Sequence, residues 1–390
     1  MGPTRPSLDL ASTVNTVNPL RPSAAALLQA SPLSVVKIGS SLLVDPAGRM
    51  RRDWMKRLVR RLDALPGSVV LVSSGAIALG RGALGLDRRP RSLAEAQAAA
   101  AVGQIHLAGA WADVWAGQGR SAAQILLTLG DLERRRRYLN ARATLEMLIE
   151  RSVVPVVNEN DTVATEEIRF GDNDRLAARV AQLIGAPLVL LLSDVDGLYS
   201  ADPAVDPAAR RIALVDELTP EIEALAGPVE RGGLGTGGMK SKLAAARIAT
   251  AAGASVVLSS GQGDDPVGTL LGGGPATVFR AGSKPLAARK RWLRGLQNPS
   301  GELVLDDGAL TALRSGASLL AVGVCDVTGR FQRGDLVRLV GPRGPCGQGL
   351  CAYESNEASR IAGLPSERIA EVLAEAGRGP MVHRDDLVLF

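Results

Sequence analysis

VVPVVNEND, residues 153–161, and GDND, residues 171–174, are the two stretches that best define this sequence. The apolar, β-branched run predicts a buried strand, and the polar residues at its C-terminal end lie where open α/β sheets bind ligands. Carboxylates there can meet an ammonium group, while amides can donate to a carboxylate or accept from an amine. A small zwitterion therefore fits this edge. Asp and Asn are also common turn and N-cap residues, so two capping turns are the structural alternative.

The pattern of strand, polar loop and helix repeats on both sides of these stretches. Ala-rich amphipathic segments, such as 93–115 and 138–150, separate the candidate strands and have helical spacing. This alternation predicts a three-layer α/β domain over 34–283, built on a doubly wound, mostly parallel sheet. The candidate strands are Ser34 to Ile38, Ser68 to Val72, Ser121 to Leu127, Val153 to Val157, Pro187 to Leu192 and Ser255 to Leu258.

The composition sets limits on the protein class. A chain of 390 residues has room for two domains, and its 46% apolar and 3% aromatic residues suit an Ala, Val, Leu and Ile core. The net charge of +5 does not by itself predict a polyanionic partner. Three late cysteines without CxxC spacing favour free thiols in a reducing compartment over a zinc site or a disulfide framework. With two His residues, imidazole catalysis has little scope.

The two ends of the chain differ in character from its middle. Five prolines interrupt residues 1–33, which predicts a flexible N-terminal extension and not a signal peptide. No stretch approaches the roughly 20 apolar residues of a membrane span, so we expect a cytoplasmic protein without a membrane partner. Residues 284–298 are basic and turn-rich and predict a linker. Regularly spaced glycines beyond it predict a small β-barrel over 299–390.

Four further motifs follow predicted strands or open predicted helices. KIGSS places Lys37 at a strand end before a small-residue turn, and SSGAIALGR places Ser74 where backbone N–H groups open a helix. Ser193 and Asp194 begin a polar loop that can contact a ribose or adenine. GGLGTGGMKSK, residues 232–242, is a candidate phosphate cradle. Taken singly, each has a structural alternative: a solvated lysine, a tight turn, a turn aspartate or a glycine hinge.

The glycine-rich stretch does not match the P-loop of common nucleotide-binding proteins. Gly233 and Gly238 have the required separation, but Met239 occupies the position where that loop needs lysine. The sequence therefore disfavours a P-loop NTPase.

Taken together, the motifs resemble those of glutamate 5-kinases, which are members of the amino acid kinase family. KIGSS, SSGAIALGR, VPVVNENDTV, FGDND, LLSDVDGLYSADP and GLGTGGMKSK occur in the family's order and approximate spacing. The resemblance extends from Leu33 to Phe390, and GELVLDDGA, GASLLAVGV and FQRGDLV resemble the PUA domain of the bacterial enzymes. Two departures are the long N-terminal extension and Ser73, where the family suggests threonine.

The resemblance implies a reaction and a set of residues. ATP and L-glutamate would give L-glutamyl 5-phosphate and ADP, the first step of proline biosynthesis. Lys37 and Lys242 would contact the transferring phosphate, and Asp174 would orient them. Ser74, Asp161 and Asn173 match the family's glutamate-binding positions, with Asn158 and Asp172 as additions. The nucleotide-binding positions are Lys37, Ser193, Asp194, Thr236, Gly237, Gly238, Met239, Lys240, Ser241 and Lys242.

The resemblance also implies cofactors and partners. Mg²⁺ would arrive with ATP and be held mainly by phosphate oxygens and water, with no dedicated protein metal site. The family is typically a homo-oligomer, so a dimer or tetramer is expected. Because an acyl phosphate is labile, hand-over to glutamyl 5-phosphate reductase is a reasonable hypothesis.

Two other functions stay open at this point. PUA domains often bind RNA, so an RNA-binding or RNA-modifying protein is one alternative. Residues 299–390 contain nine Arg and no Lys against twelve Asp and Glu, which argues against a nucleic-acid partner. The run Arg134 to Arg137 predicts a solvated or intersubunit helix face. The second alternative is a sibling kinase for aspartate, N-acetylglutamate or UMP.

Overall fold

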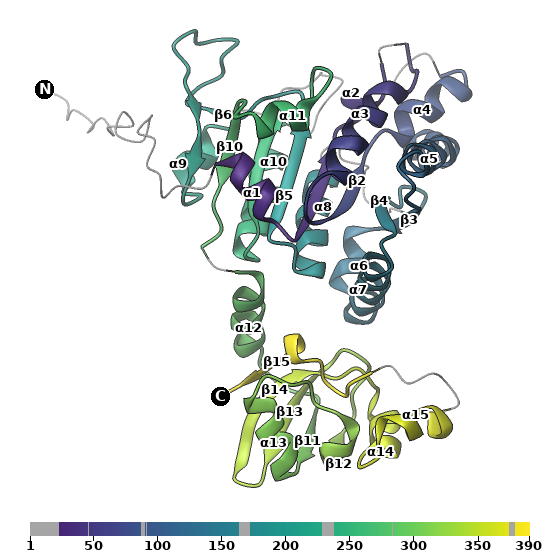
Figure 1. Cartoon of the computed structure of the whole chain (residues 1–390), viewed down its shortest axis with the longest axis vertical. Helices are drawn as coiled ribbons and strands as arrows, with labels where there is room; N and C mark the ends of the chain where they lie inside the picture. Colours follow the sequence, from purple (N-terminus) through teal and green to yellow (C-terminus); the bar gives the residue numbers. More distant parts are fainter. Residues whose placement is uncertain are drawn as a thin grey trace, which may run out of the picture. The chain divides into compact units, whose positions relative to one another are not determined.

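The chain forms two compact units (Figure 1). In this computed structural model, the structure describes residues 23–45, 47–86, 90, 92–163, 172–227, 238–282, 284–373 and 379–390, with only the backbone at Arg135 and Asp172. Unit 1 comprises residues 1–129 and 145–282, and unit 2 comprises residues 130–144 and 283–390.

An eight-stranded sheet forms the centre of unit 1, with the strand order β3-β4-β2-β1-β5-β9-β10-β8. Neighbouring strands run parallel except β10, which is antiparallel to β9. The predicted mostly parallel sheet is therefore confirmed. The strands are β1 (Leu33–Ile38), β2 (Ser68–Ser73), β3 (Ala122–Leu127), β4 (Val154–Glu159), β5 (Leu188–Ser193), β8 (Leu214–Val215), β9 (Ser255–Ser260) and β10 (Ala276–Phe279).

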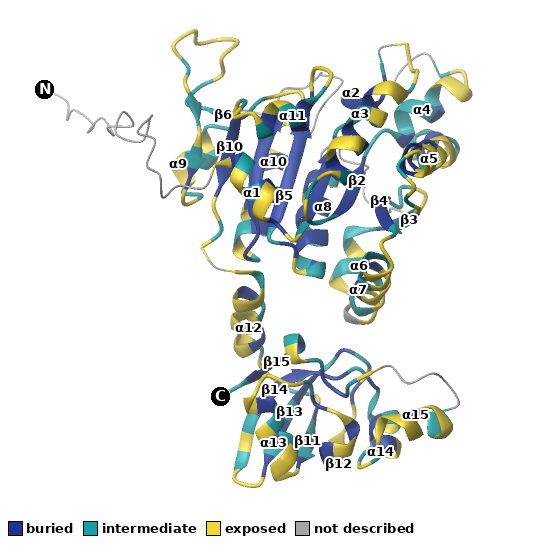
Figure 2. Cartoon of the chain, viewed as in Figure 1, coloured by how far each residue is buried: buried dark blue, intermediate teal, exposed yellow. Residues whose placement is uncertain are grey.

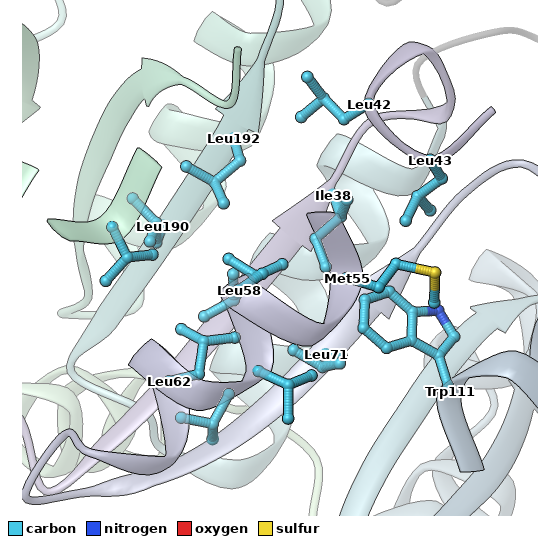
Figure 3. Close-up of a cluster of buried hydrophobic side chains, with 14 of the residues drawn as sticks. Ile38, Leu42, Leu43, Met55, Leu58, Leu62, Leu71, Trp111, Leu190 and Leu192 are labelled. Atoms are coloured by element: carbon cyan, nitrogen blue, oxygen red, sulfur yellow. The ribbon is translucent and has the colours of Figure 1, made fainter. Parts of the chain in front are cut away.

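Helices pack against both faces of this sheet. The helices of one face, α1 (Ala24–Ala30), α3 (Arg52–Asp63), α5 (Leu93–Ala116) and α11 (Pro266–Leu271), bury a continuous apolar core with the sheet. Figure 3 shows part of this core, in which Ile38 of β1 and Leu71 of β2 lie against Met55 and Leu58 of α3. The helices of the other face, α8 (Asp172–Ile184) and α10 (Met239–Ala251), contact each other, β1 and β9.

The alternation of side chains along β1 explains how one strand contributes to both the core and a polar site. Val36 and Ile38 belong to the apolar core, whereas Lys37, between them, pairs with Asp174 on α8. Successive side chains of a strand point to opposite faces, so this difference follows from the sequence VVKI. Shorter elements complete unit 1: α2 (Ser40–Leu43), α4 (Ala76–Ala83), β6 (Leu198–Tyr199), β7 (Arg211–Ile212) and α9 (Pro220–Ala224).

Unit 2 contains a five-stranded sheet with the order β12-β11-β13-β14-β15. Its core is built mainly from aliphatic side chains and also contains Phe331 and the fully buried Tyr353. The strands are β11 (Gly301–Leu305), β12 (Val324–Gly329), β13 (Leu336–Gly341), β14 (Gly344–Leu350) and β15 (Leu387–Leu389). The helices are α12 (Pro285–Gly295), α13 (Asp307–Arg314), η2 (Ala321–Gly323), α14 (Ser355–Ile361), α15 (Ser366–Leu373) and η3 (Arg384–Asp386).

A buried ion cluster joins three segments of unit 2. Both oxygens of the Asp386 carboxylate accept from Arg142 at 2.9 Å, and Arg289 of α12 donates to the same carboxylate. Arg142 belongs to α7 (Arg135–Glu150), which follows α6 (Leu129–Glu133) between β3 and β4. Residues 130–144 are therefore part of unit 2, although they lie far from its other residues in the sequence.

Part of the predicted N-terminal extension is ordered, which corrects the prediction. Ser23 caps α1 by accepting from the backbone N–H of Ala26 at 3.1 Å. Leu28 is fully buried. Figure 2 shows how burial varies among the elements, with β5 coloured as buried. Tertiary packing thus holds a short helix that its proline-rich surroundings conceal. Residues 1–22 lie outside the described part of the chain, and the predicted linker contains α12.

Candidate active site

Three charged side chains from separate elements meet at one point of unit 1. Nζ of Lys37, on β1, lies 2.6 Å from Oδ1 of Asp174, on the first turn of α8. Nζ of Lys242, on the first turn of α10, lies 3.7 Å from Oδ2 of the same carboxylate. The exposed fractions of Lys37, Asp174 and Lys242 are 6%, 0% and 4%. A buried carboxylate thus holds two buried ammonium groups side by side.

The environment changes the proton affinity of this cluster. Burial raises the pKa of Asp174, but the two lysine charges and hydrogen bonds from Lys37 and Ser241 outweigh burial and hold it below its ordinary value. Burial and the neighbouring Lys37 lower the pKa of Lys242, against the attraction of Asp174 and Asp194. The carboxylate is therefore ionised at neutral pH, and Lys242 loses its proton more easily than an exposed lysine.

The beginning of α10 adds a hydroxyl group and an open helix end. Oγ of Ser241 donates to Oδ2 of Asp174 at 2.7 Å. Gly238 is the N-cap residue and makes no side-chain cap, so the first N–H groups of the helix receive no such partner. Helix N-termini of this kind bind anions through their N–H groups and the helix dipole. Lysine charges and an open helix end therefore favour a phosphate group here.

A second group of polar side chains lies on the other side of the first turn of α8. Nδ2 of Asn173 donates to Oγ of Ser74 at 2.8 Å and to Oδ1 of Asn158 at 3.1 Å. Asn158 is the last buried residue of β4 before its polar end, and Ser74 follows β2. Neighbouring residues of one helix, Asn173 and Asp174, thus serve two separate clusters.

One atom of this second cluster lacks a partner. Oδ1 of Asn173 is shielded from solvent, and no hydrogen-bond donor among the described residues reaches it. A buried acceptor without a partner costs free energy, so native structures contain few of them. An arriving N–H group restores the missing hydrogen bond. This orphaned oxygen is the clearest sign in unit 1 of a ligand that carries a donor.

Two residues that the sequence motifs did not reveal support the amide cluster from α5. Oε1 of Gln104 accepts from Nδ2 of Asn158 at 2.7 Å. Nε1 of Trp111 donates to Oγ of Ser73 at 2.9 Å, one residue before Ser74. The two residues are seven positions apart, so they share one face of the helix. A lone glutamine in the Ala-rich stretch AAAAVGQIHL is the only signal that the sequence offers for Gln104.

The remaining predicted residues have fewer contacts with these two clusters. Asp161 lies in the turn that follows β4, and Ser193 ends β5 with its hydroxyl bonded to the backbone of Val195. Asp194, beside it, is close enough to Lys242 to raise the pKa of that lysine. Met239 and Lys240 open α10. Thr236 and Gly237 lie outside the described residues, and only the backbone of Asp172 is described.

The charged groups of the site do not resemble a dedicated metal centre. Among the described residues, no group of three or more His, Cys, Asp and Glu side chains could hold a metal ion. The central carboxylate, Asp174, is already engaged by two lysines and a serine.

Comparison with known proteins identifies the family. The family model "Amino acid kinase family" matches residues 32–259, and the model "PUA domain" matches residues 301–373. Glutamate 5-kinase 1 from Mesorhizobium japonicum is 52% identical over 358 residues, which cover 91% of this chain and 94% of that protein. Glutamate 5-kinase 1 from Rhizobium meliloti is also 52% identical, with 91% of both chains covered.

A third relative extends this result beyond these two genera. Glutamate 5-kinase from Rhodopseudomonas palustris is 51% identical over 360 residues, 91% of this chain and 96% of that protein. Within the described residues, no helix has the length and apolarity that a membrane crossing requires. The chain thus belongs to the amino acid kinase family and, within it, to the glutamate 5-kinases.

Proposed function

We propose that the two polar clusters of unit 1 transfer the γ-phosphate of ATP to the side-chain carboxylate of L-glutamate. The products are L-glutamyl 5-phosphate and ADP, and the reaction is the first step of proline biosynthesis. The observation that carries the proposal is the position of Asn173 and Asp174. These neighbours in α8 connect an amide cluster suited to an amino acid with a lysine cluster suited to phosphate.

The chemistry requires charge neutralisation more than proton transfer. A carboxylate is ionised at neutral pH, so its oxygen attacks phosphorus without a general base, and the bond from phosphorus to the β,γ-bridging oxygen breaks. Both reactants are anions, and at ~4 Å two like charges repel by roughly 4 kcal/mol at an effective dielectric near 20. Fixed cations along the transfer path therefore lower the barrier.

Lys37 and Lys242 supply these cations in the proposal. Both ammonium groups are nearly fully buried, so their fields are screened less by water than those of surface lysines. Asp174 is a positioning residue, because its carboxylate pairs with both lysines and holds their ammonium groups side by side. Ser193, Asp194 and residues 236–242 hold the nucleotide. Within that segment, the open end of α10 supports a phosphate contact.

The acceptor half binds glutamate through Ser74, Asn158, Asp161 and Asn173. The orphaned Oδ1 of Asn173 accepts from the substrate ammonium group, and Asp161 adds a negative charge for the same group. Asp172 contributes at the start of α8. Phosphate oxygens and water would hold the Mg²⁺ that accompanies ATP, and the ion would supply additional positive charge to the phosphates. All other steps depend on the residues of the chain.

The substrate assignment is tested by ADP release with four acceptors: L-glutamate, L-aspartate, N-acetylglutamate and UMP. We expect the highest kcat/KM with L-glutamate and a product that hydroxylamine traps as a hydroxamate, because an acyl phosphate reacts with this nucleophile. A higher kcat/KM with another acceptor would contradict the substrate assignment.

The role of the lysine cluster is tested by Lys242→Ala. We expect kcat to fall by at least about 100-fold, because removing one fixed charge at the transferring group costs several kcal/mol. Lys56→Ala is the matched control, since Lys56 lies on α3 with its side chain 62% exposed and, among the described residues, pairs with Asp53. Near-normal turnover of the Lys242 variant would remove this residue from the mechanism.

The remaining partners are also proposed from family membership. We propose a cytoplasmic homo-oligomer, dimer or tetramer, that passes its labile product to glutamyl 5-phosphate reductase. Light scattering tests the assembly, because a mass above that of the 40.5 kDa chain is expected. Flux through both enzymes tests the hand-over, since direct transfer protects the product from hydrolysis and a lack of protection contradicts it.

A further inference from the structure

We propose that Gln104 of α5 is a specificity-determining positioning residue, which sets the hydrogen-bond polarity of the acceptor site and selects a substrate with an amino group. This inference rests on the proposed function and concerns a residue that contributes to none of the phosphate contacts. Gln104 acts through Asn158, whose Nδ2 donates to its Oε1 at 2.7 Å.

The first step is that the backbone fixes one end of the amide chain. The N–H of Glu159 lies 2.9 Å from the side chain of Asn158, and a backbone N–H can only donate. The facing atom must therefore be the oxygen of Asn158, so its NH₂ group points to Gln104. That group needs an acceptor, because Asn158 is only 2% exposed. Among the described residues, Oε1 of Gln104 provides it.

The second step is that the backbone also fixes the other end. Nδ2 of Asn173 lies 3.4 Å from the carbonyl oxygen of Ser73 and 3.1 Å from Oδ1 of Asn158, and both of these atoms can only accept. The NH₂ group of Asn173 is consumed by these contacts and by Ser74. The oxygen of the same amide therefore takes no part in these contacts, and it is the buried acceptor that no described donor reaches.

The third step connects these amides to substrate choice. An amide oxygen without a partner pairs with an ammonium group and repels a carboxylate oxygen, which can only accept. Without the Gln104 oxygen, the buried NH₂ group of Asn158 lacks a partner, and rotation of Asn158 toward another acceptor breaks its contact with Asn173. Without that contact, the amide of Asn173 is held less firmly in the orientation that leaves its oxygen available to the substrate. Glutarate, which is glutamate without the amino group, measures this loss directly.

A second contact of α5 supports a positioning role for the Gln104–Asn158 hydrogen bond. Trp111, two turns further along the same face, donates to Oγ of Ser73, the residue whose carbonyl oxygen accepts from Asn173. Trp111 lies among the buried residues of the core in Figure 3 and is fully buried. Gln104 therefore projects from a helix that is held firmly at a neighbouring turn.

The test compares three replacements of Gln104 in the full chain. Gln104→Met keeps the length and removes both polar atoms, Gln104→Glu keeps an acceptor, and Gln104→Asn withdraws it by about one carbon–carbon bond. Gln118→Met is the control, because Nε2 of Gln118, beyond the end of α5, donates to the carbonyl of the neighbouring Gly117 and lies outside the amide cluster. KM for glutamate, KM for ATP, kcat and the kcat/KM ratio of glutamate to glutarate are measured for each.

For Gln104→Met we expect KM for glutamate to rise about 10- to 100-fold, as for a buried NH₂ group without a partner. KM for ATP stays within about twofold, and the glutamate-to-glutarate ratio narrows at least about fivefold. Gln104→Glu restores both quantities to within about threefold of wild type. If Gln104→Met does not fold, as judged by its thermal unfolding, Gln104→Asn must show the same selective loss.

Coupling to Asn158 is tested by a double-mutant cycle. In a chain that already carries Asn158→Ala, Gln104→Met should change KM for glutamate by less than about twofold, because the contact no longer exists. Full additivity overturns the proposal, as does wild-type selectivity of Gln104→Met or equal losses with Met and Glu. In each of these cases wild-type glutamate kinase activity persists. A wild-type chain without that activity instead refutes the proposed function.

Discussion

Asp174 has a different role from the other carboxylates that form ion pairs in unit 1. It is fully buried between two buried lysines, whereas Asp113, for example, is 64% exposed beside Arg52. Exposed pairs contribute little to stability, but removing one partner of a buried pair leaves a charge without compensation. The lysine cluster therefore depends on a single carboxylate.

We predict that Asp174→Asn lowers the free energy of unfolding at pH 7 by about 3–5 kcal/mol, because two buried ammonium groups lose their counter-ion. Urea unfolding followed by circular dichroism measures the change. Asp113→Asn is the control and should stay within about 0.5 kcal/mol of wild type. Equal effects of the two substitutions would show that burial of the Asp174 cluster has no energetic consequence.

We predict an early alkaline limit to activity. Burial lowers the pKa of Lys242 from its ordinary 10.5, so its charge is lost, and kcat falls, at a lower pH than for an exposed lysine. The free energy of unfolding changes in the opposite direction. Below the folded pKa of Lys242 its buried charge destabilises the folded chain, and this destabilisation is relieved as pH rises from the folded pKa toward 10.5.

The pH dependence of kcat for Lys242→Arg checks this assignment. A guanidinium group stays charged above pH 12, so the alkaline limb of the remaining activity should move upward. An unchanged limb would assign the titration to another group.

At the scale of single residues, the sequence revealed the chemistry of the site but not its support. The motifs named Lys37, Asp174 and Lys242, and the structure brings them together. Gln104 and Trp111 carry no motif, since a helix-face residue acquires its partner only when α5 packs beside β2 and β4. Contacts of this kind depend on tertiary structure, which residue types in one segment do not encode.

At the scale of elements, α4 and α5 approach each other more closely than side chains would permit. A Cβ at Gly103 would lie 1.8 Å from the carbonyl oxygen of Ala76, and one at Gly80 would lie 1.8 Å from that of Ala99. Only glycine fits at both positions, so the backbones of the two helices touch. This contact fixes the distance between α4 and α5, and therefore the position of Gln104 on α5.

We predict that Gly103→Ala destabilises the chain by about 3 kcal/mol or more, because the added methyl group meets backbone atoms that cannot rotate away. Thermal unfolding measures the effect, and a parallel rise of KM for glutamate is expected. Gly109→Ala on the same helix is the control, since nothing lies within 4 Å of the added Cβ. That variant should be more stable by about 0.5–1 kcal/mol. A tolerated Gly103→Ala would contradict the close contact.

Elements with long apolar runs were predictable, and short ones were not. The six strands expected in the α/β domain correspond to β1, β2, β3, β4, β5 and β9. β10 contains only four residues and follows three glycines, and α1 contains seven residues among prolines. Their local signals are weak because they are stabilised mainly by packing, as the complete burial of Leu28 and near-complete burial of Phe279 show.

At the scale of the whole molecule, the net charge lies in one unit. Residues 130–144 and 283–390 contain 19 Lys and Arg against 14 Asp and Glu, a surplus equal to the +5 of the complete chain. The acidic balance counted over 299–390 does not describe this unit, because residues 130–144 and 284–298 are strongly basic. The absence of a nucleic-acid partner stays a prediction.

We predict that Asp386→Asn destabilises unit 2 by about 3–5 kcal/mol, because Arg142 and Arg289 lose the carboxylate that compensates them. Calorimetry of the full chain measures the change. Asp385→Asn is the control, since its carboxylate is 32% exposed and lies 3.6 Å or more from His383 and Arg384. If the Asp386→Asn variant unfolded at the wild-type temperature, a stabilising role of the cluster would be contradicted.

The same cluster has a consequence for protein synthesis. Arg142 precedes Asp386 by 244 residues, so at roughly 5–20 residues per second the ribosome completes the partner about 10–50 s later. Unit 1 can be translated in full before Asp386, the partner of Arg142 in segment 130–144, has been synthesised. A nascent chain that stalls after residue 282 therefore exposes the cationic segment 130–144 to chaperones and proteases. Residues 283–390 fused alone to another protein would likewise lack residues 130–144, which belong to the same unit.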